Sequence, residues 1–214
     1  SVTLQHLLIG EVWLCAGQSN MVMPLNGFDY CPISDSNNVI ADAPNHPGIR
    51  MVTIKPTVKL SPQEYAEGSW QQPTTENAPK FSAAAYHYAL TLQRTLQIPI
   101  GVITCAWGGS RVEGWLPKEI LQTYKDEDLT LIGSDKTPVY LQSMLMYNGI
   151  LYPCHKYTIK GFIWYQGESN VRSSRTYAER LATMVKHWRS IWKQGDLPFY
   201  YVETVPFACE YKED

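Results

Sequence analysis

Three short polar or glycine-rich segments each follow an apolar run that predicts a buried strand. The first is the turn Gly17-Gln18-Ser19-Asn20-Met21. A serine on a tight turn after a buried strand can present its hydroxyl at the sheet edge, with its own N–H free to bind an oxyanion. Met21 stands where the G-x-S-x-G nucleophile elbow has its last glycine, so this is a different motif. Turn serines more often serve as caps, so the segment alone does not establish catalysis.

The second segment is Trp107-Gly108-Gly109-Ser110-Arg111. Two glycines let the backbone approach a ligand closely and aim N–H groups at developing negative charge. A simple tight turn leading out of the strand explains the pair equally well. The absence of G-x-G-x-x-G and P-loop patterns argues against a nucleotide site.

The third segment, residues 164–170, reads Trp-Tyr-Gln-Gly-Glu-Ser-Asn. Gln166 can donate an amide hydrogen to an oxyanion, and Glu168 can orient a histidine as the acid of a catalytic triad. Alternatively, both side chains cap the structure that follows. Each residue taken alone favours that plainer explanation.

The hydrophobic pattern predicts alternating strands and helices. Strands are expected at 10–16, 49–54, 99–107, 159–166 and 199–205, helices at 82–96 and 175–192, and a long surface loop at 26–48. Continuously apolar strands that alternate with helices indicate a parallel sheet buried on both faces. Ligands bind outside the carboxyl ends of such strands, where the three segments should meet.

The composition is that of a globular domain of 214 residues, with 44% hydrophobic and 18% charged residues. A formal net charge of −2 gives no electrostatic reason to expect nucleic acid or an anionic membrane as a partner. No apolar stretch approaches the ~18 residues of a membrane span. The 7 Trp and 14 Tyr suit a sugar-binding cleft, although packing accounts for them equally well.

Five cysteines are present without a CxxC pair or a His/Cys cluster, so neither a metal site nor a redox motif is indicated. Cys15 and Cys105 lie in apolar runs and are expected to be small buried residues. Cys31, Cys154 and Cys209 are expected in loops, where a disulfide is possible but its pairing is open.

Together the three segments resemble the SGNH hydrolase superfamily, and more narrowly the sialate O-acetylesterases and their relatives in carbohydrate esterase family 6. The resemblance rests on residues 10–21, 101–115 and 160–170. It implies an α/β, three-layer, flavodoxin-like fold with a central, mostly parallel five-stranded sheet, truncated at its C-terminal end. Residues 1–9 resemble the end of a preceding β domain or linker, and residues 10–214 resemble the esterase core without its C-terminal histidine loop and closing helix.

The resemblance also implies roles for individual residues. Ser19 matches the nucleophile, and Glu168 matches the glutamate that some relatives use as the triad acid. The Ser19 N–H, Gly109 (in preference to its neighbour) and the Gln166 side chain match the oxyanion hole. Neither a metal nor an organic cofactor is expected.

Two further residues are expected to contact substrate. Arg111 can bind the carboxylate of a sialic acid bidentately, although an ion pair with Glu113 is the alternative. Asn20, which follows the nucleophile, is the second.

The histidine that the family uses as base lies after the fifth strand, and no histidine of this chain takes that place. The five present are His6, His46, His87, His155 and His187. Loss of the serine or histidine of a triad removes about 10⁶-fold of rate. We therefore expect a further segment of the same polypeptide to supply the imidazole.

The expected function is removal of acetyl esters from sugar hydroxyls, foremost those of O-acetylated sialic acids. An acetylxylan or other polysaccharide deacetylase is the enzymatic alternative, and a non-catalytic carbohydrate-binding module is the alternative from another class. The family also implies an extracytoplasmic location: periplasmic, secreted or lysosomal.

Overall fold

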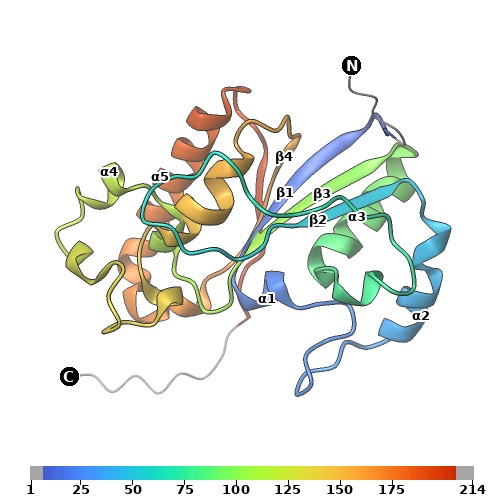
Figure 1. The fold of residues 1–214 in the computed structure, drawn as a ribbon, viewed down its shortest axis with the longest axis horizontal. Coiled ribbons are helices and arrows are strands. Elements are labelled where there is room, and N and C mark those ends of the chain that lie inside the picture. Colours follow the sequence, from blue (N-terminus) through green and yellow to red (C-terminus); the bar gives the residue numbers. More distant parts are fainter. Residues whose placement is uncertain (1–6, 206–214) are drawn as a thin grey trace.

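The computed structural model describes residues 7–205, which form a three-layer α/β fold around one sheet (Figure 1). The five strands are β1 (Glu11–Gly17), β2 (Ile49–Thr53), β3 (Ile100–Ala106), β4 (Gly161–Tyr165) and β5 (Phe199–Tyr201). All neighbouring pairs are parallel. The predicted five-stranded parallel sheet is therefore confirmed.

The strand order is β2-β3-β1-β4-β5, which places β1 at the centre. It differs from the 2-1-3-4-5 order of flavodoxin because β3 lies between β2 and β1. The chain leaves β1 toward one edge and later crosses to β4 on the other side. The carboxyl end of β1 thus lies at a topological switch point, the usual place for a ligand in an open α/β sheet.

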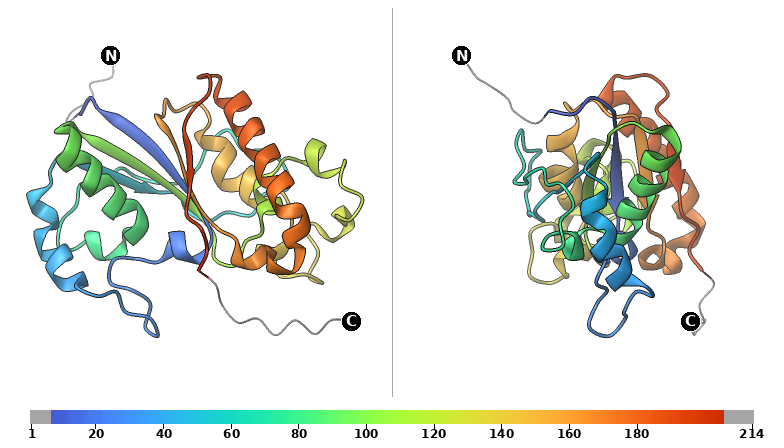
Figure 2. Two further views of the ribbon diagram at one scale, coloured as in Figure 1. Left: turned by 180° about the vertical axis from the view of Figure 1, so that it is seen from behind. Right: turned by 90° about the vertical axis from the view of Figure 1, so that its right-hand side faces the viewer.

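Helices cover both faces of this sheet (Figures 1 and 2). On one face lie α1 (Ser19–Val22), α2 (Ser36–Asp42) and α3 (Ala83–Leu96). On the other lie α4 (Lys118–Leu121), α5 (Ser174–Trp192) and the π-helical turn η6 (Tyr147–Leu151). Short 3₁₀ turns complete the layers: η1 (Ala43–Asn45), η2 (Ala78–Lys80), η3 (Val112–Trp115), η4 (Leu129–Leu131), η5 (Val139–Leu141), η7 (Tyr152–Cys154) and η8 (Glu168–Ser173).

The apolar run of β1 divides between these two layers. Trp13 and Cys15 pack into the core beneath α3, whereas Leu14 and Ala16 pack into the core beneath α5. Side chains alternate between the faces of a strand, so a strand buried on both sides must be apolar throughout. This requirement explains the continuous hydrophobic pattern that predicted the strand.

The two long helices form where the sequence predicted them. The Ser82 Oγ caps α3 by accepting from the Ala85 N–H at 3.3 Å, and α3 buries Ala85 and Ala89 against the sheet. Met184, Trp188 and Trp192 form the buried face of α5. Both helices end at a residue in the left-handed region.

Two predicted segments differ from the observed ones. The expected loop at 26–48 contains α2, whose residues are all at least partly exposed, so no apolar periodicity marks this helix in the sequence. The expected strand at 199–205 is regular only over Phe199–Tyr201. One more backbone bond follows, from the Val202 N–H to the Trp164 carbonyl at 2.9 Å, and residues 202–205 are irregular. The predicted β-domain segment at 1–9 lies mostly outside the described residues, and 7–9 are irregular.

Most of the tryptophans serve packing. Trp115, Trp164 and Trp188 are almost fully buried and meet edge to face, with ring centroids 5.6 to 6.4 Å apart. Edge-to-face geometry is favourable for aromatic pairs. The abundance of tryptophan therefore reflects the core beneath α5 more than a sugar-binding surface.

Candidate active site

The three predicted segments converge at the carboxyl edge of the sheet. Gly17, at the end of β1, pairs with Ala106 of β3 on one side and with Tyr165 of β4 on the other. Backbone hydrogen bonds continue just beyond, from the Trp107 N–H to the Gly17 carbonyl and from the Gln18 N–H to the Tyr165 carbonyl, both 3.0 Å. The segments at 17–21, 107–111 and 164–170 therefore lie next to one another at the carboxyl edge of the sheet.

Ser19 is the first residue of α1, directly beyond the central strand. The turn needs glycine at position 17, which has a φ of 146° and where a Cβ atom would lie 2.1 Å from the Tyr165 carbonyl oxygen. Met21, where an elbow would have glycine, is buried and accepts the Ser82 hydroxyl on its sulfur at 3.6 Å. Within the described part of the chain, the half-buried Ser19 side chain has no hydrogen-bond partner and remains available to a ligand.

The glycine pair lies beside this serine. A Cβ atom added to Gly108 would lie 4.0 Å from the Ser19 Cβ. Gly109 has a φ of 76°, and a Cβ atom there would collide with the ring of Tyr140 at 2.8 Å. Gly109 was our expected oxyanion donor, and its preference over Gly108 remains a prediction. Tyr140, which no sequence motif indicated, closes over Gly109.

Glu168 and Asn20 are brought into direct contact. The Asn20 Nδ2 donates to the Glu168 Oε1 at 2.6 Å, across 148 positions of sequence. The other carboxylate oxygen of Glu168, Oε2, is buried and has no hydrogen-bond partner among the described residues. A buried acceptor of this kind is suited to receive an N–H from an imidazole. The expected contact of Asn20 with substrate remains a prediction; in this structure its amide is bonded to Glu168.

Gln18 is a structural residue that the sequence reasoning missed. Its buried side-chain oxygen accepts from the Gly167 N–H at 3.2 Å and from the Ser169 N–H at 3.3 Å. The two donors are the residues on either side of Glu168. Gln18 therefore links the third segment (164–170) to the first (17–21). Its position next to Ser19 was the only available signal, because the partners are remote in sequence.

Gln166 is buried, and its amide hydrogens are already in use. Its Nε2 donates to the Ser110 carbonyl at 3.1 Å and to the Asn170 Oδ1 at 2.7 Å, whereas its Oε1 has no partner in the described structure. A donor role toward an oxyanion would require one of these bonds to be exchanged. That role remains a prediction.

Arg111 lies among carboxylates behind the second turn. Its Nη2 donates to the Glu127 Oε1 at 2.8 Å and to the Leu141 carbonyl at 2.9 Å, and its Nε lies 3.8 Å from the Glu113 Oε2. These contacts occupy Nε and Nη2, so bidentate binding of a substrate carboxylate, which remains a prediction, would compete with them. The ion-pair alternative matches the observed arrangement, with Glu127 as the nearer carboxylate.

None of the four histidines inside residues 7–205 makes a hydrogen bond to Ser19 or Glu168. His46 pairs with Asp42 at 2.9 Å, and His87 is exposed on α3. The Nδ1 of His155 lies 2.6 Å from the Tyr152 carbonyl oxygen. His187 is half-buried with its Nε2 2.9 Å from the Tyr147 hydroxyl, and burial lowers its pKa. His6 lies outside the described residues.

The described cysteines are all free thiols. Cys15 and Cys105 are buried, as predicted, and burial raises the pKa of both. Cys154 was expected in a loop but is buried, with its sulfur 3.8 Å from that of Cys105. Cys31 is exposed, and Cys209 lies outside the described residues.

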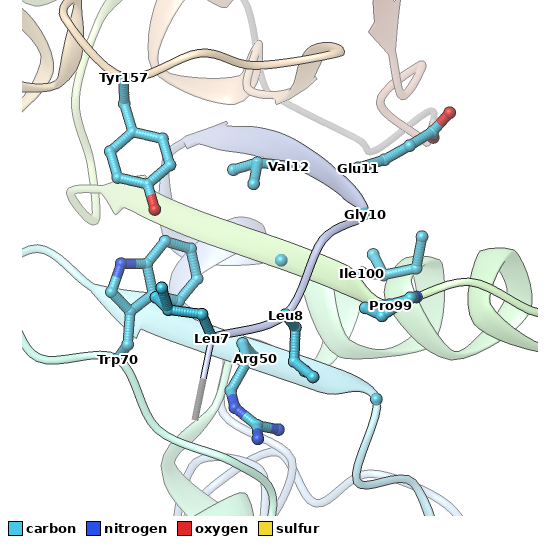
Figure 3. A pocket seen from close by; sticks show the side chains of 12 residues that line it. Leu7, Leu8, Gly10, Glu11, Val12, Arg50, Trp70, Pro99, Ile100 and Tyr157 are labelled. Carbon is cyan, nitrogen blue, oxygen red and sulfur yellow. The ribbon is translucent and has the colours of Figure 1, made fainter. Parts of the chain in front are cut away.

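An open groove of about 340 Å³ lies at the opposite, amino edge of the sheet (Figure 3). Its lining includes Leu7, Leu8, Arg50, Trp70 and Tyr157, and the two aromatic rings are 5.8 Å apart. None of the predicted site residues line it. None of the helices within residues 7–205 combines the length and the hydrophobicity that a membrane span requires. In the same residues, no group of three or more His, Cys, Asp or Glu side chains is placed to hold a metal ion.

Comparison with known proteins identifies relatives of this chain. A family profile described as "Carbohydrate esterase, sialic acid-specific acetylesterase" matches residues 9–213. The sialate O-acetylesterases of Homo sapiens and Pongo abelii are each 27% identical over 204 residues. Those alignments cover 91% of this chain but 38% of either relative, so the chain spans well under half of their length.

Solved structures agree with the fold. A carbohydrate acetylesterase from Xanthomonas citri is 31% identical, with a TM-score of 0.75 over 90% of this chain and 41% of that protein. A protein from Arabidopsis thaliana is 17% identical, with a TM-score of 0.52 over 89% of this chain and 72% of its own. The second similarity concerns the fold alone.

Proposed function

Because this chain belongs to the sialic acid-specific acetylesterase family of carbohydrate esterases, we propose that the polypeptide containing it removes acetyl esters from sugar hydroxyls, with Ser19 as the nucleophile. The observation that carries this proposal is the position of Ser19. Its unpaired side chain lies just beyond the carboxyl end of the central strand, beside a glycine pair. The next residue, Asn20, holds a carboxylate with one unpartnered oxygen.

The proposed reaction proceeds through an acyl-enzyme. The Ser19 Oγ attacks the acetyl carbonyl carbon while an imidazole takes its proton. The tetrahedral oxyanion is stabilised by the N–H groups of Ser19 and Gly109, and by Gln166 if one of its amide bonds is exchanged. The C–O bond to the sugar then breaks, and the imidazole returns the proton to the leaving oxygen. Water releases acetate by the same route and regenerates Ser19.

Glu168 is proposed to orient that imidazole. Asn20 holds one carboxylate oxygen, and the second is buried and unpartnered, ready to accept a ring N–H. None of the described histidines makes a hydrogen bond to Ser19 or Glu168, so we propose that the imidazole comes from another part of the polypeptide. The greater length of the relatives supports this proposal.

The proposed substrates are O-acetylated sialic acids, because the family description and the curated relatives both name sialate esters. The engaged side chain of Arg111 is the feature that favours the alternative, a neutral acetylated polysaccharide such as acetylxylan. We propose an extracytoplasmic location, where such glycans occur.

The decisive experiment is acetate release by the full-length polypeptide from O-acetylated sialic acid and, in parallel, from acetylated xylan. We expect Ser19→Ala to lower kcat by at least about 10⁴-fold, since loss of a triad serine removes the nucleophile. Ser190→Ala, an exposed serine on α5, is the matched control and should retain wild-type activity.

Three results would contradict the proposal in different ways. Full activity in Ser19→Ala would exclude Ser19 as nucleophile. Hydrolysis of xylan esters alone would replace the sialate assignment with the polysaccharide one. Sugar binding without hydrolysis of either ester by the wild-type protein would favour a carbohydrate-binding module.

A further inference from the structure

A buried polar network connects the second and third turns behind the active site. Asn170 is its centre, and 2% of its surface is exposed. Its Oδ1 accepts from the Gln166 Nε2 at 2.7 Å and from the Val112 N–H at 2.9 Å. Its Nδ2 donates to the Glu113 Oε2 at 3.0 Å. One side chain therefore contacts both turns at once.

The network is anchored by a buried ion pair. Glu113 is fully buried and accepts from the Arg180 guanidinium of α5, which also donates to Asp126 at 2.5 Å. Burial opposes the charge on Arg180, but the hydrogen bond and charge of Glu113, together with Asp126, leave its pKa above the ordinary value. Arg180 is thus held in its charged form within the fold, with the Glu113 carboxyl group as its buried partner.

This anchor determines which way the Asn170 amide points. Glu113, as a carboxylate, only accepts hydrogen bonds, so it selects the Nδ2 of Asn170 and directs the Oδ1 toward Gln166. That oxygen in turn selects the Nε2 of Gln166, whose second hydrogen goes to the Ser110 carbonyl. The Glu113 carboxylate therefore sets the orientation of Gln166 indirectly, through Asn170.

We propose that Asn170 is a positioning residue: held by the Glu113–Arg180 pair, it fixes the Gln166 carboxamide and keeps the two turns at a constant separation beside Ser19. The inference rests on the proposed esterase function for its kinetic consequence. Small displacements of groups around a reacting centre lower kcat more than they affect substrate binding.

The test compares Asn170→Ala with Asn148→Ala in the full-length polypeptide. Asn148 is also 2% exposed, and its Nδ2 donates to the Lys59 carbonyl, away from the strand-end turns. We expect Asn170→Ala to lower kcat by about 10- to 100-fold with KM within threefold. Asn148→Ala should retain kcat within threefold. Equal kcat losses in the two variants would overturn the inference.

A second variant, Asn170→Asp, keeps the acceptor and the volume but places a carboxylate against Glu113. The charged groups around this position are Glu113 and Arg180, with Asp126 and Glu127 beside Arg180, and Arg111 3.8 Å from Glu113. Lower pH should let the new carboxyl pair share a proton and restore the donor. We therefore expect the kcat ratio of Asn170→Asp to wild type to rise as pH falls. A ratio independent of pH would contradict the proposed link.

A measurement that does not depend on activity separates this inference from the proposed function. In ¹⁵N-glutamine-labelled protein, the side-chain amide of Gln166 should exchange slowly with solvent in wild type and Asn148→Ala, and at least tenfold faster in Asn170→Ala. If the wild-type protein hydrolyses no ester, the proposed function fails and this readout decides the positioning role. An unchanged Gln166 amide in Asn170→Ala would overturn it.

Discussion

The polar side chains around Ser19 mostly bind one another. Gln18 bridges two N–H groups of the third turn, Asn20 holds Glu168, and Asn170 joins Gln166 to Val112. Buried polar groups must find partners, so residues grouped by a motif need not all reach the substrate. Among the described residues of these segments, the Ser19 hydroxyl, the Glu168 Oε2 and the Gln166 Oε1 have no hydrogen-bond partner.

Removal of the Asn20 side chain tests this division of roles. Asn20→Ala takes away the partner of the Glu168 Oε1, which Asn20 contacts at 2.6 Å. Because a freer Glu168 would orient the imidazole less well, we expect kcat for ester hydrolysis to fall about tenfold while KM changes less than threefold. Steady-state kinetics on an O-acetylated sugar measure both.

The opposite pattern would assign Asn20 to substrate binding. A rise in KM with kcat unchanged indicates lost binding that is equal in the ground and transition states. Asn38→Ala, at an exposed position of α2, serves as the control and should change neither constant.

At the scale of elements, α5 has two functions along its length. Its first half supplies Arg180 to the network behind the active site, and its second half packs Trp188 and Trp192 onto the sheet. The apolar periodicity that predicted the helix comes from the residues packed on the sheet. The first function was invisible in the sequence, because the partner Glu113 lies 67 positions away.

His187, also on α5, makes stability depend on pH. Burial lowers its pKa in the folded state, so at pH values just below about 6.5 the unfolded chain binds a proton that folded His187 does not. Its contribution is therefore present above the ordinary histidine pKa and is lost as pH falls through the lowered one. When the pH is lowered from 7.5 to 5.5, the free energy of unfolding should therefore decrease less in His187→Gln than in wild type. Urea denaturation at each pH measures this decrease.

The matched variant for this experiment is His87→Gln, which removes an exposed histidine of α3. It should keep the wild-type dependence of stability on pH. If His187→Gln also follows the wild-type curve, the buried histidine does not contribute to the acid sensitivity.

At the scale of the whole molecule, two separate cores lie on opposite faces of one sheet. The core beneath α5 centres on Trp188, which is fully buried and donates its indole N–H to the Trp115 carbonyl at 3.2 Å. Trp188 also contacts Phe162 of β4 and Phe199 of β5. This core therefore packs η3 against β4 and β5.

Trp188→Ala should therefore destabilise the fold strongly. Deleting a fully buried aromatic side chain costs about 3–5 kcal/mol, because a cavity is left in a close-packed interior. Urea denaturation compares it with Trp70→Ala, where the ring is 38% exposed and the loss should stay below about 1.5 kcal/mol. Equal losses would show that the core beneath α5 is not a principal source of stability.

The sequence by itself determined where the strands and long helices lie, which turns carry the candidate chemistry, and the fold class. Continuous apolar runs and helical periodicity are local consequences of burial, so they can be read along the chain. Ser19 and Glu168 were candidates because each follows a predicted strand, and their roles, which remain predictions, came from the family resemblance. That the segments carrying them meet at one edge follows from parallel strands.

The tertiary structure decided the strand order, the helix at 36–42 and the partners of the polar side chains. Asn20 meets Glu168 across 148 positions and Gln166 meets Ser110 across 56, so neither contact leaves a local pattern. The same holds for Arg111, whose partner could be any nearby carboxylate until the fold placed Glu127 beside it. Hydrogen bonding requires distances near 3 Å, and only packing of the whole chain sets distances between remote segments on that scale.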